Sequence, residues 1–563
     1  MYKEGKMVLS GKWKSLQNGS DIRGVALDTN PEEKVNLTEY ESRMILEGFI
    51  AWLDTQKSQL LSPYKIAVGV DSRISGPALK QAALETIKSK GHLALDCGIA
   101  STPAMFMSCI YPETACDGAI MITASHLPSN RNGLKFFTAE GGLEKQDISF
   151  ILTKAQELSE GSNASSKEAS ASKDASNSKE DSASKETSSL KEASTSSKAS
   201  ELKSNSPSST VGRIENLDLI SIYAKDLADK IRVGVNSSEN YERPLEGMKI
   251  VVDAGNGAGG FFADKILEVL GADTTGSQFL EPDGLFPNHI PNPEDKEAMD
   301  SITRAVIDNK ADLGLIFDTD VDRAAAVDKL GRAINRNRII ALMAAIVLEE
   351  HPGTTIVTDS ITSSELKKFI EKDLKGRHHR FKRGYKNVIN ESIRLNSIGE
   401  ESHLAIETSG HGALKENYFM DDGAYLTAKI LIRAARLKKE GKTIDMLIEA
   451  MEDPLEAKEF RLGLGADDFL AYGQTVLEEL SVFAEQENDW HIEEPNYEGI
   501  RVSFDKGHGD GWFLLRMSLH DPIMPLNIES NSPGGVRTIA GALMGFLAKY
   551  PDLETRAIRE YMG

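Results

Sequence analysis

Five short apolar runs recur along the chain, and helix-like stretches separate them. The runs are KIAVGVD (65–71), GAIMITAS (118–125), MKIVVDAG (248–255), ADLGLIFDTD (311–320) and TTIVTDS (354–360). Unbroken apolar strands that alternate with helices are typical of parallel sheets covered by helices on both faces. In open sheets of this kind, ligands bind beyond the carboxyl ends of the strands. The polar residues that end several of these runs therefore mark the expected site.

The chain is long enough for several domains, and it carries a large acidic excess. Its 563 residues are 40% hydrophobic, and a domain commonly spans roughly 100 to 200 residues. A formal net charge of −21 argues against a broad nucleic-acid surface, because phosphate backbones are bound by an excess of lysine and arginine. We therefore predict a small-molecule partner and no nucleic acid.

Cysteine usage and hydropathy indicate a reducing compartment. Cys97, Cys109 and Cys116 form an odd set without CxxC spacing, which favours neither a disulfide framework nor a zinc site. No apolar run approaches the roughly 18 residues of a membrane helix, and the first residues lack a signal-like apolar stretch. We expect a soluble protein of the cytoplasm or the plastid stroma, with no membrane partner.

Residues 158–210 break the strand–helix pattern. This stretch is rich in Ser, Ala, Lys and Glu, and Leu190 and Leu202 are its only large apolar residues after position 158. Such a composition buries too little surface to offset the cost of ordering a backbone, so we predict a disordered insertion. It is either a tolerated surface-loop expansion or a tether that is phosphorylated or binds a partner.

The segment TASHLPSNRNGLK (123–135) places a serine and a histidine where an apolar strand ends. Ser125 and His126 are followed by Gly133 and Lys135. A hydroxyl in this position can act as a nucleophile or carry a phosphoryl group. It can equally cap a helix at an ordinary turn. The segment alone leaves both interpretations open.

Three carboxylates follow the next strand in the sequence FDTDVDR (317–323). Asp318, Asp320 and Asp322 alternate by two, so they can converge on one hard cation. An EF-hand is excluded, because its sixth and twelfth positions require Gly and Glu and are here Arg323 and Lys329. Carboxylates without thiolates favour magnesium and phosphoryl chemistry, and the alternative is a solvated acidic loop.

A third polar cluster lies in AIETSGHGALKENYFMDDG (405–423). Glu407 and Ser409 can grip vicinal sugar hydroxyls, and His411 can act as an acid or a base. A histidine in a glycine-rich turn is often only structural, but its neighbours here favour a functional interpretation.

The glycine-rich DAGNGAGG (253–260) matches the dinucleotide fingerprint in form only. Gly255, Gly257 and Gly260 fit GxGxxG, and Glu281 follows about twenty residues later. Close packing of a helix on its sheet explains the same glycines and is the favoured interpretation. A nicotinamide-dependent oxidoreductase is the alternative that this motif supports.

Together these motifs resemble those of the α-D-phosphohexomutases, the family of phosphoglucomutase, phosphomannomutase and phosphoglucosamine mutase. The resemblance covers nearly the whole chain outside the insertion. It runs in order through GSDIRGV (19–25), VDSR (70–73), TASHLPSNRNGLKFF (123–137), VVDAGNGAGG (251–260), PDGLFPNHIPNPE (282–294), DTDVDR (318–323), RGYKNVI (383–389) and ETSGH (407–411).

The resemblance implies an α/β fold of four domains around a central cleft. Three are mixed α/β sandwich domains, and a smaller α+β domain follows at the C-terminal end. We place them at 1–210, 211–332, 333–453 and 454–563, and each contributes one loop to the cleft: the phosphoserine, metal-binding, sugar-binding and phosphate-binding loops in turn.

The same resemblance implies a role for each residue of the site. Ser125 would be the phosphoserine, and one oxygen of its phosphate with Asp318, Asp320 and Asp322 would hold one Mg²⁺ per chain. The acid/base and charge-stabilising groups would be Arg23, His126, Lys135 and His411. The substrate-binding residues would be Arg323, Lys386, Glu407, Ser409, Arg516 and Ser518.

The last loop departs most from the family pattern. The family carries an Arg-Pro-Ser-(Gly/Asn)-Thr-Glu-Pro stretch closely followed by a second arginine. Here GWFLLRMSLHDPIMPLNIES (511–530) keeps Arg516, Ser518 and Pro522 but has Pro525 where the second arginine is expected. A replacement anion site at Ser530–Arg537, before a helix-like run, and an ordinary capped turn are equally supported. Leu127, in place of the usual Asn, is a milder departure.

These observations predict a phosphohexomutase that interconverts hexose 1-phosphate and 6-phosphate, with glucose or glucosamine phosphate as the substrate. It would work through a phosphoserine and a bisphosphate intermediate, with hexose 1,6-bisphosphate as activator. The departures in the last loop sustain an alternative, a divergent sugar-phosphate-binding regulatory relative with little turnover.

Overall fold

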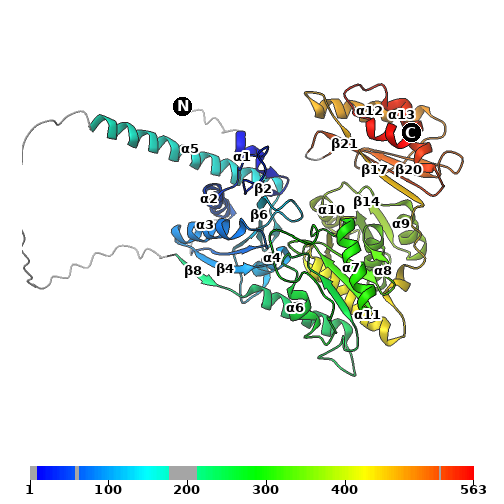
Figure 1. The fold of residues 1–563 in the computed structure, drawn as a ribbon, viewed down its shortest axis with the longest axis horizontal. Coiled ribbons are helices and arrows are strands. Elements are labelled where there is room, and N and C mark those ends of the chain that lie inside the picture. Colours follow the sequence, from blue (N-terminus) through cyan, green and yellow to red (C-terminus); the bar gives the residue numbers. More distant parts are fainter. Residues whose placement is uncertain (1–8, 57–62, 177–211, 519–520) are drawn as a thin grey trace, which may run out of the picture.

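Four sheets, each with its own helices, follow one another along the chain (Figure 1). The computed structural model describes residues 9–56, 63–176, 212–518 and 521–563, and for residues 162–176 only the path of the backbone. We refer to the four sheets with their helices as the first to the fourth domain.

The first domain is built on an eight-stranded mixed sheet, in the order β1-β2-β6-β5-β3-β4-β8 with β7 paired to β6. Strands β5, β3, β4 and β8 are parallel, and the remaining pairs are antiparallel. The strands are β1 (Gln17–Asn18), β2 (Asp21–Val25), β3 (Lys65–Val70), β4 (Leu93–Ile99), β5 (Gly118–Ile122), β6 (Arg131–Thr138), β7 (Gly141–Gly142) and β8 (Arg213–Asn216). Strand β8 follows the position where we expected the second domain to begin, so this sheet continues past residue 211.

The helices of the first domain are α1 (Gly11–Ser15), α2 (Glu39–Gln56), α3 (Gly76–Ser89), α4 (Thr102–Ile110) and α5 (Lys145–Ser176). Helix α5 projects from the body of the domain (Figure 1). The prediction that disorder begins at residue 158 is therefore wrong up to Ser176. Ala, Lys and Glu favour helix, and extending a helix that is already anchored needs no new nucleation. The rest of the predicted insertion, from residue 177, lies outside the described residues.

The second and third domains each carry a four-stranded mixed sheet. Their orders are β12-β11-β10-β9 and β14-β13-β15-β16. The strands are β9 (Ile250–Asp253), β10 (Leu313–Phe317), β11 (Ala324–Asp328) and β12 (Ala333–Ile334), then β13 (Thr355–Thr358), β14 (Arg377–Arg380), β15 (Ser402–Ile406) and β16 (Gly412–Leu414).

Three long helices of these two domains begin at aspartate caps. Asp218, Asp295 and Asp422 each accept hydrogen bonds from backbone N–H groups in the first turns of α6, α7 and α11. The elements are α6 (Leu219–Val235), the π-helix η1 (Phe262–Leu267) and α7 (Lys296–Asn309), then α8 (Asn337–Glu350), α9 (Ser364–Lys368), the π-helix η2 (Phe369–Asp373), α10 (Tyr385–Ser397), the 3₁₀ helix η3 (Lys415–Asn417), α11 (Gly423–Lys439) and the 3₁₀ helix η4 (Ile444–Ile448).

The fourth domain has an antiparallel five-stranded sheet in the order β17-β21-β20-β19-β18. Its elements are β17 (Glu456–Gly463), α12 (Phe469–Gln486), β18 (His491–Ile492), β19 (Ile500–Phe504), β20 (Gly511–Leu515), β21 (Ile523–Ser530), α13 (Gly535–Leu547) and α14 (Arg556–Met562). A separate hydrophobic core lies within this domain.

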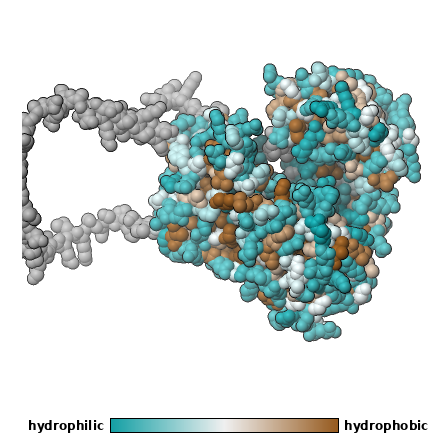
Figure 2. Space-filling model, in the orientation of Figure 1, coloured by the Kyte–Doolittle hydropathy of each residue, from teal (hydrophilic) through white to brown (hydrophobic). Residues whose placement is uncertain are grey.

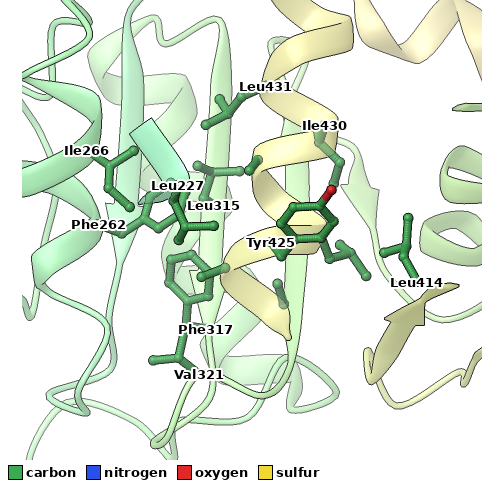
Figure 3. Close-up of a cluster of buried hydrophobic side chains, with 14 of the residues drawn as sticks. Leu227, Phe262, Ile266, Leu315, Phe317, Val321, Leu414, Tyr425, Ile430 and Leu431 are labelled. Carbon is green, nitrogen blue, oxygen red and sulfur yellow. The ribbon is translucent and has the colours of Figure 1, made fainter. Parts of the chain in front are cut away.

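A single buried apolar cluster extends through the first three domains. Figure 3 shows its central part, where Leu227 of α6 and Phe317 at the end of β10 lie near Tyr425 and Leu431 of α11. Because β10 leads directly into the aspartate loop, this packing fixes that loop against the third domain.

The surface is largely hydrophilic, and a hollow separates the first and fourth domains (Figure 2). No helix of the described part of the chain is long and apolar enough to cross a membrane.

Candidate functional site

Ser125 lies just beyond strand β5 and has an unusual backbone. Its φ of 50° is in the left-handed region, which costs a residue with a side chain about 1 kcal/mol or more. The backbone N–H of Ser125 donates to the Thr123 hydroxyl at 2.8 Å. The serine is only 5% exposed. A strained, buried serine is typical of a functional position.

The side chain of Ser125 meets the aspartate loop of the second domain. Its Oγ donates to Asp318 Oδ2 at 2.9 Å and accepts from Arg323 Nη2 at 3.0 Å. Asp318 and Arg323 are themselves buried. The structure thus brings together two loops that are almost 200 residues apart in the sequence.

The three aspartates form a compact buried group. Oxygens of Asp318, Asp320 and Asp322 all lie within 4.8 Å of one another. The Oδ1 atoms of Asp320 and Asp322 are buried and have no hydrogen-bond partner among the described residues. Unpaired carboxylate oxygens that converge at this separation fit a hard divalent cation such as Mg²⁺.

Without a bound cation, the negative charges of the three buried carboxylates repel one another. Burial, followed by the charges of Asp322 and Asp320, raises the pKa of Asp318 well above its ordinary value. Lys135 stabilises the charged forms of Asp320 and Asp322, because its Nζ donates to Asp320 Oδ2 at 3.0 Å and to Asp322 Oδ2 at 2.5 Å. Burial alone would raise the pKa of Asp322, but Lys135, His411 and Arg323 together outweigh burial and lower it.

Arg23 and Thr102 complete the surroundings of the two loops. Arg23, on β2, donates from Nη1 to the carbonyl oxygen of Thr123 at 2.7 Å and from Nη2 to Asp21 at 2.9 Å. Thr102, the first residue of α4, donates through Oγ1 to Asp320 Oδ2 at 2.5 Å. Arg23 was predicted, whereas Thr102 was not: a hydroxyl at a helix start after a strand was the only signal in the sequence.

Two histidines flank the serine and the aspartates. His126 Nδ1 lies 3.4 Å from Ser125 Oγ and also contacts Arg323. The positive charge of Arg323 and burial lower the pKa of His126 to about 2. His411 Nε2 lies 3.6 Å from Asp322 Oδ1, and burial lowers the pKa of His411 to about 3. Both imidazoles are therefore neutral near pH 7.

The sugar-binding candidates of the third domain adjoin His411. Ser409 Oγ is 2.8 Å from His411 Nδ1, and Glu407 Oε1 accepts the Gly384 N–H at 2.6 Å. Burial and the nearby Asp359 raise the pKa of Glu407 to about 8. An isolated β-bridge pairs the backbone of His411 with that of Arg323. The loop of residues 407–411 and the aspartate loop are therefore in direct backbone contact.

Tyr385 is a further residue of the site that the sequence did not single out. Its ring stacks on His411 with centroids 5.5 Å apart, and its hydroxyl is 2.9 Å from Ser20 Oγ. The tyrosine therefore links the third domain to the first beside the histidine. Its place within RGYKNVI was visible in the sequence, but its partners were not.

Lys386, Arg516 and Ser518 lie apart from this group. Lys386 Nζ donates to the carbonyl oxygen of Gly142 at 2.6 Å and so docks the third domain onto the first. Arg516 is 7% exposed, its Nε has no partner among the described residues, and its Nη1 is 3.8 Å from Glu498. Ser518 Oγ accepts the Asp521 N–H at 3.2 Å.

The fourth domain reaches the rest of the chain through the third domain. Arg501 Nη1 donates to the Ser360 carbonyl oxygen at 3.1 Å, and Arg380 Nη1 donates to Glu493 at 3.0 Å. Arg516 and Ser518 are thus attached to the site through polar contacts rather than through the shared apolar cluster.

The alternative anion site before α13 is already filled by the protein itself. Glu456 accepts hydrogen bonds from the backbone N–H groups of Gly534 at 2.6 Å and Val536 at 3.1 Å. Arg537 donates to the carbonyl oxygens of Met562 and Tyr561. The proposed replacement site is therefore wrong, because a side chain 78 residues away occupies the helix terminus.

The glycines of DAGNGAGG serve close packing. A Cβ at Gly257 would lie 2.7 Å from the Thr319 carbonyl oxygen, and one at Gly260 would lie 2.2 Å from that of Leu280. The Ala258 N–H donates to Thr319 at 2.8 Å. This turn therefore supports the aspartate loop from behind, as the packing interpretation expects.

Three family models match successive parts of the chain. The models of the first, second and third α/β/α domains of phosphoglucomutase/phosphomannomutase match residues 14–160, 222–331 and 335–454. Together they cover more than half of the chain.

Curated relatives match over almost their whole length. A phosphomannomutase/phosphoglucomutase of Pseudomonas syringae is 28% identical over 539 residues, which cover 95% of each chain. A phosphoglucomutase of Neisseria gonorrhoeae is 28% identical over 491 residues, 87% of this chain and 90% of the relative.

Solved structures share the fold. A phosphoglucomutase/phosphomannomutase family protein from Burkholderia thailandensis superposes with a TM-score of 0.70 at 22% identity, covering 95% of this chain and 98% of its own. The Paramecium phosphoprotein pp63/parafusin, a phosphoglucomutase in its open form, gives 0.65 at 14% identity, covering 98% and 96%.

Proposed function

The chain belongs to the α-D-phosphohexomutase superfamily, and from this premise we propose that it interconverts hexose 1-phosphate and hexose 6-phosphate through a phosphorylated Ser125. The contact of Ser125 Oγ with Asp318 and Arg323 is the observation that carries the proposal. A structural serine at a turn has no need of a buried acidic trio and a guanidinium around its hydroxyl.

The reaction would proceed in two transfers. In the first, the bond between Ser125 Oγ and phosphorus breaks as a sugar hydroxyl of the hexose monophosphate forms a new bond to phosphorus, giving a bisphosphate. The bisphosphate would then turn over in the cleft. In the second transfer, the bond between its other phosphorus and the sugar oxygen breaks as Ser125 Oγ bonds to that phosphorus, which regenerates phosphoserine and releases the isomeric hexose monophosphate. Such transfer depends on in-line positioning and neutralised charge, and Lys135, Arg23 and Arg323 would supply positive charge around the serine.

Asp318, Asp320 and Asp322 would hold one Mg²⁺, for which their converging carboxylates fit, two of them with an oxygen that has no hydrogen-bond partner among the described residues. When bound, the ion supplies neutralisation of phosphoryl oxygens. Hexose 1,6-bisphosphate would act as activator by phosphorylating Ser125.

Proton transfer would fall to His411. Its imidazole is neutral near pH 7, since burial lowers its pKa to about 3, and Asp322, whose Oδ1 lies 3.6 Å from Nε2, would stabilise the imidazolium that forms when it accepts the proton of the sugar hydroxyl. Glu407 and Ser409, beside it, would orient the sugar through its hydroxyls. Arg516 and Ser518 would bind the phosphate that is not being transferred.

Glucose phosphate is the substrate that we propose first. The relatives named above are called phosphoglucomutase or phosphomannomutase/phosphoglucomutase, which supports glucose and then mannose phosphate over glucosamine phosphate. The test is to incubate the protein with Mg²⁺ and catalytic hexose 1,6-bisphosphate and to follow glucose, mannose and glucosamine 1-phosphates in parallel. Conversion of none of them would contradict the proposal.

The altered last loop favours a second candidate, a sugar-phosphate-binding relative with little turnover. Leu519, His520 and Asp521 replace polar and small residues of the family pattern. Calorimetric binding of glucose 6-phosphate without conversion would support this candidate. The intact surroundings of Ser125 argue for turnover.

A further inference from the structure

Arg73 is a buried arginine whose donors nearly all go to backbone carbonyl oxygens of one loop. It lies just after β3, and its side chain is 0% exposed. Nη1 donates to the carbonyl oxygens of Pro128 at 2.6 Å and Arg131 at 3.0 Å, and Nη2 donates to those of Leu127 at 2.6 Å and Ser125. The loop from Ser125 to Arg131 is thus wrapped around one guanidinium.

The geometry of the guanidinium is fixed from its other side. Arg73 Nε contacts Asp71 Oδ2 at 3.2 Å, and Asp71 Oδ1 accepts the Arg73 N–H at 2.9 Å. The Phe286 ring of the second domain lies 5.4 Å from the guanidinium carbon. A planar group held at its base and on its face presents its remaining N–H groups in fixed directions.

The second domain also rests on the backbone at this point. A Cβ on Gly284 would lie 2.5 Å from the Ser72 carbonyl oxygen and 2.6 Å from the Ile74 nitrogen. Glycine at 284 therefore permits the turn before Phe286 to lie directly against residues 72–74. Arg73 therefore contacts both the serine loop and the second domain, which carries the aspartates.

Ser125 needs support of this kind. Its left-handed backbone, with φ of 50°, is unfavourable for a residue with a Cβ. Its N–H is bound by the Thr123 hydroxyl, and its carbonyl oxygen is bound by Arg73. These two hydrogen bonds hold both ends of the residue, which directs its side chain toward Asp318.

We propose that Arg73 is a positioning residue that holds Ser125 in its left-handed conformation and thereby aims Oγ at the aspartate loop. The catalytic consequence rests on the proposed function, whereas the conformational claim does not. Lysine cannot replace arginine here, because a single ammonium with three protons cannot reach the carbonyl oxygens and Asp71 in one plane.

A double-mutant cycle tests the conformational claim through thermal stability, without an activity assay. Glycine adopts a positive φ at no steric cost, so Ser125→Gly relieves the strain that Arg73 counteracts. We expect Arg73→Lys to lower the melting temperature less in the Ser125→Gly protein than in the wild type. Equal losses in both backgrounds, including failure of both to fold, would overturn the link between Arg73 and Ser125.

Amide hydrogen exchange provides the second readout. In Arg73→Lys, exchange in residues 124–131 should accelerate at least about tenfold, while the β3 and β5 amides remain protected. Arg332→Lys, in an exposed arginine that pairs with Asp328 and Asp445, is the matched control and should change neither segment. Unchanged exchange in residues 124–131 of Arg73→Lys would contradict the proposal.

Kinetics then test the consequence for catalysis. Misplacement of a reacting group by about 1 Å can cost roughly 100-fold in rate, so Arg73→Lys should lower kcat and the rate of Ser125 phosphorylation by about that factor with KM unchanged. Guanidinium ion should restore part of the activity of Arg73→Ala. A wild type that is never phosphorylated would refute the proposed function alone, whereas equal phosphorylation of wild type and Arg73→Lys would refute the positioning role.

Discussion

The junction of the first two domains and the last loop of the fourth domain are built in opposite ways. At the junction, Ser125, Asp318 and Arg323 are buried and in direct contact. In the last loop, Arg516 has an Nε without a partner among the described residues, and its Nη1 makes only a 3.4 Å hydrogen bond to the Met517 carbonyl oxygen and a 3.8 Å approach to Glu498. Among the described residues, the unsatisfied atoms at the junction are carboxylate oxygens of Asp320 and Asp322, which suit a cation, whereas that of the last loop is a guanidinium nitrogen, which suits an anion.

The difference follows from how each region is attached. The aspartate loop continues from β10, whose side chains belong to the apolar cluster of the first three domains. The fourth domain has its own core and reaches the third through polar contacts such as Arg501 with Ser360. The residues proposed for catalysis therefore lie on the part that shares the apolar cluster, and those proposed for phosphate binding lie on the domain that is joined through polar contacts. The following predictions test this division, from the largest expected effect to the smallest.

Ser125→Ala should abolish turnover. Removing a nucleophile on which other groups converge costs about 10⁶-fold in kcat, and in the described part of the chain no other hydroxyl accepts from Arg323 and donates to Asp318. The mutase assay measures this, with Ser397→Ala, an exposed serine that donates to the Arg394 carbonyl oxygen, as control. Residual activity within tenfold of wild type would place the chemistry elsewhere.

Asp318→Asn should lower activity but raise stability in the absence of Mg²⁺. We expect kcat to fall by about 10²- to 10³-fold, because a ligand of the ion is weakened. In the absence of Mg²⁺ the melting temperature should rise, because burial and two neighbouring carboxylates disfavour the charged form of Asp318. Thermal melts with and without Mg²⁺ check this. A lower melting temperature in metal-free buffer would show that the acidic trio is not strained.

Arg516→Lys should raise KM for the hexose phosphate about tenfold with little change in kcat, since the loss of a bidentate donor weakens ground-state and transition-state binding alike. Ser518→Ala should raise KM about threefold. Arg537→Ala is the control and should leave KM unchanged, because this arginine binds the carbonyl oxygens of Tyr561 and Met562. A KM effect of Arg537→Ala as large as that of Arg516→Lys would revive the anion site before α13.

Glu529→Gln should change the pH dependence of stability. Burial raises the pKa of Glu529 from 4.5 to about 7 in the folded protein, although Arg501 opposes the shift. The folded state therefore binds an extra proton between these values, so its contribution to stability falls as the pH rises from 4.5 through 7. Between pH 5 and pH 8, the melting temperature of the variant should fall by roughly 2 to 4 °C less than that of the wild type. Parallel melting curves for the two proteins would contradict this assignment.

Much of the site could be predicted because its signals are local. Ser125, Asp318 and His411 each follow an apolar strand, where ligands of α/β sheets bind, although the three strands belong to three different sheets. The family resemblance supplied the order of the loops and the four domains. The roles of these residues stay predictions, but their proximity is now observed.

The remainder depends on partners that sequence does not reveal. Glu456 fills the terminus of α13 from 78 residues away, and Lys386 docks onto the Gly142 carbonyl oxygen. Arg73 binds backbone carbonyl oxygens, which every residue carries and which leave no mark in the sequence. The helical extension to Ser176 continues a helix that begins at Lys145.

The central claim is that Ser125 carries the phosphate, and phosphopeptide mapping tests it most directly. The full-length protein would be incubated with hexose 1,6-bisphosphate and Mg²⁺ and digested, and the peptides would be sequenced by mass spectrometry. We expect one phosphate per chain, at Ser125, which is lost when hexose monophosphate is added. A protein that remains unphosphorylated, or that is modified at another residue while turning over substrate, would contradict it.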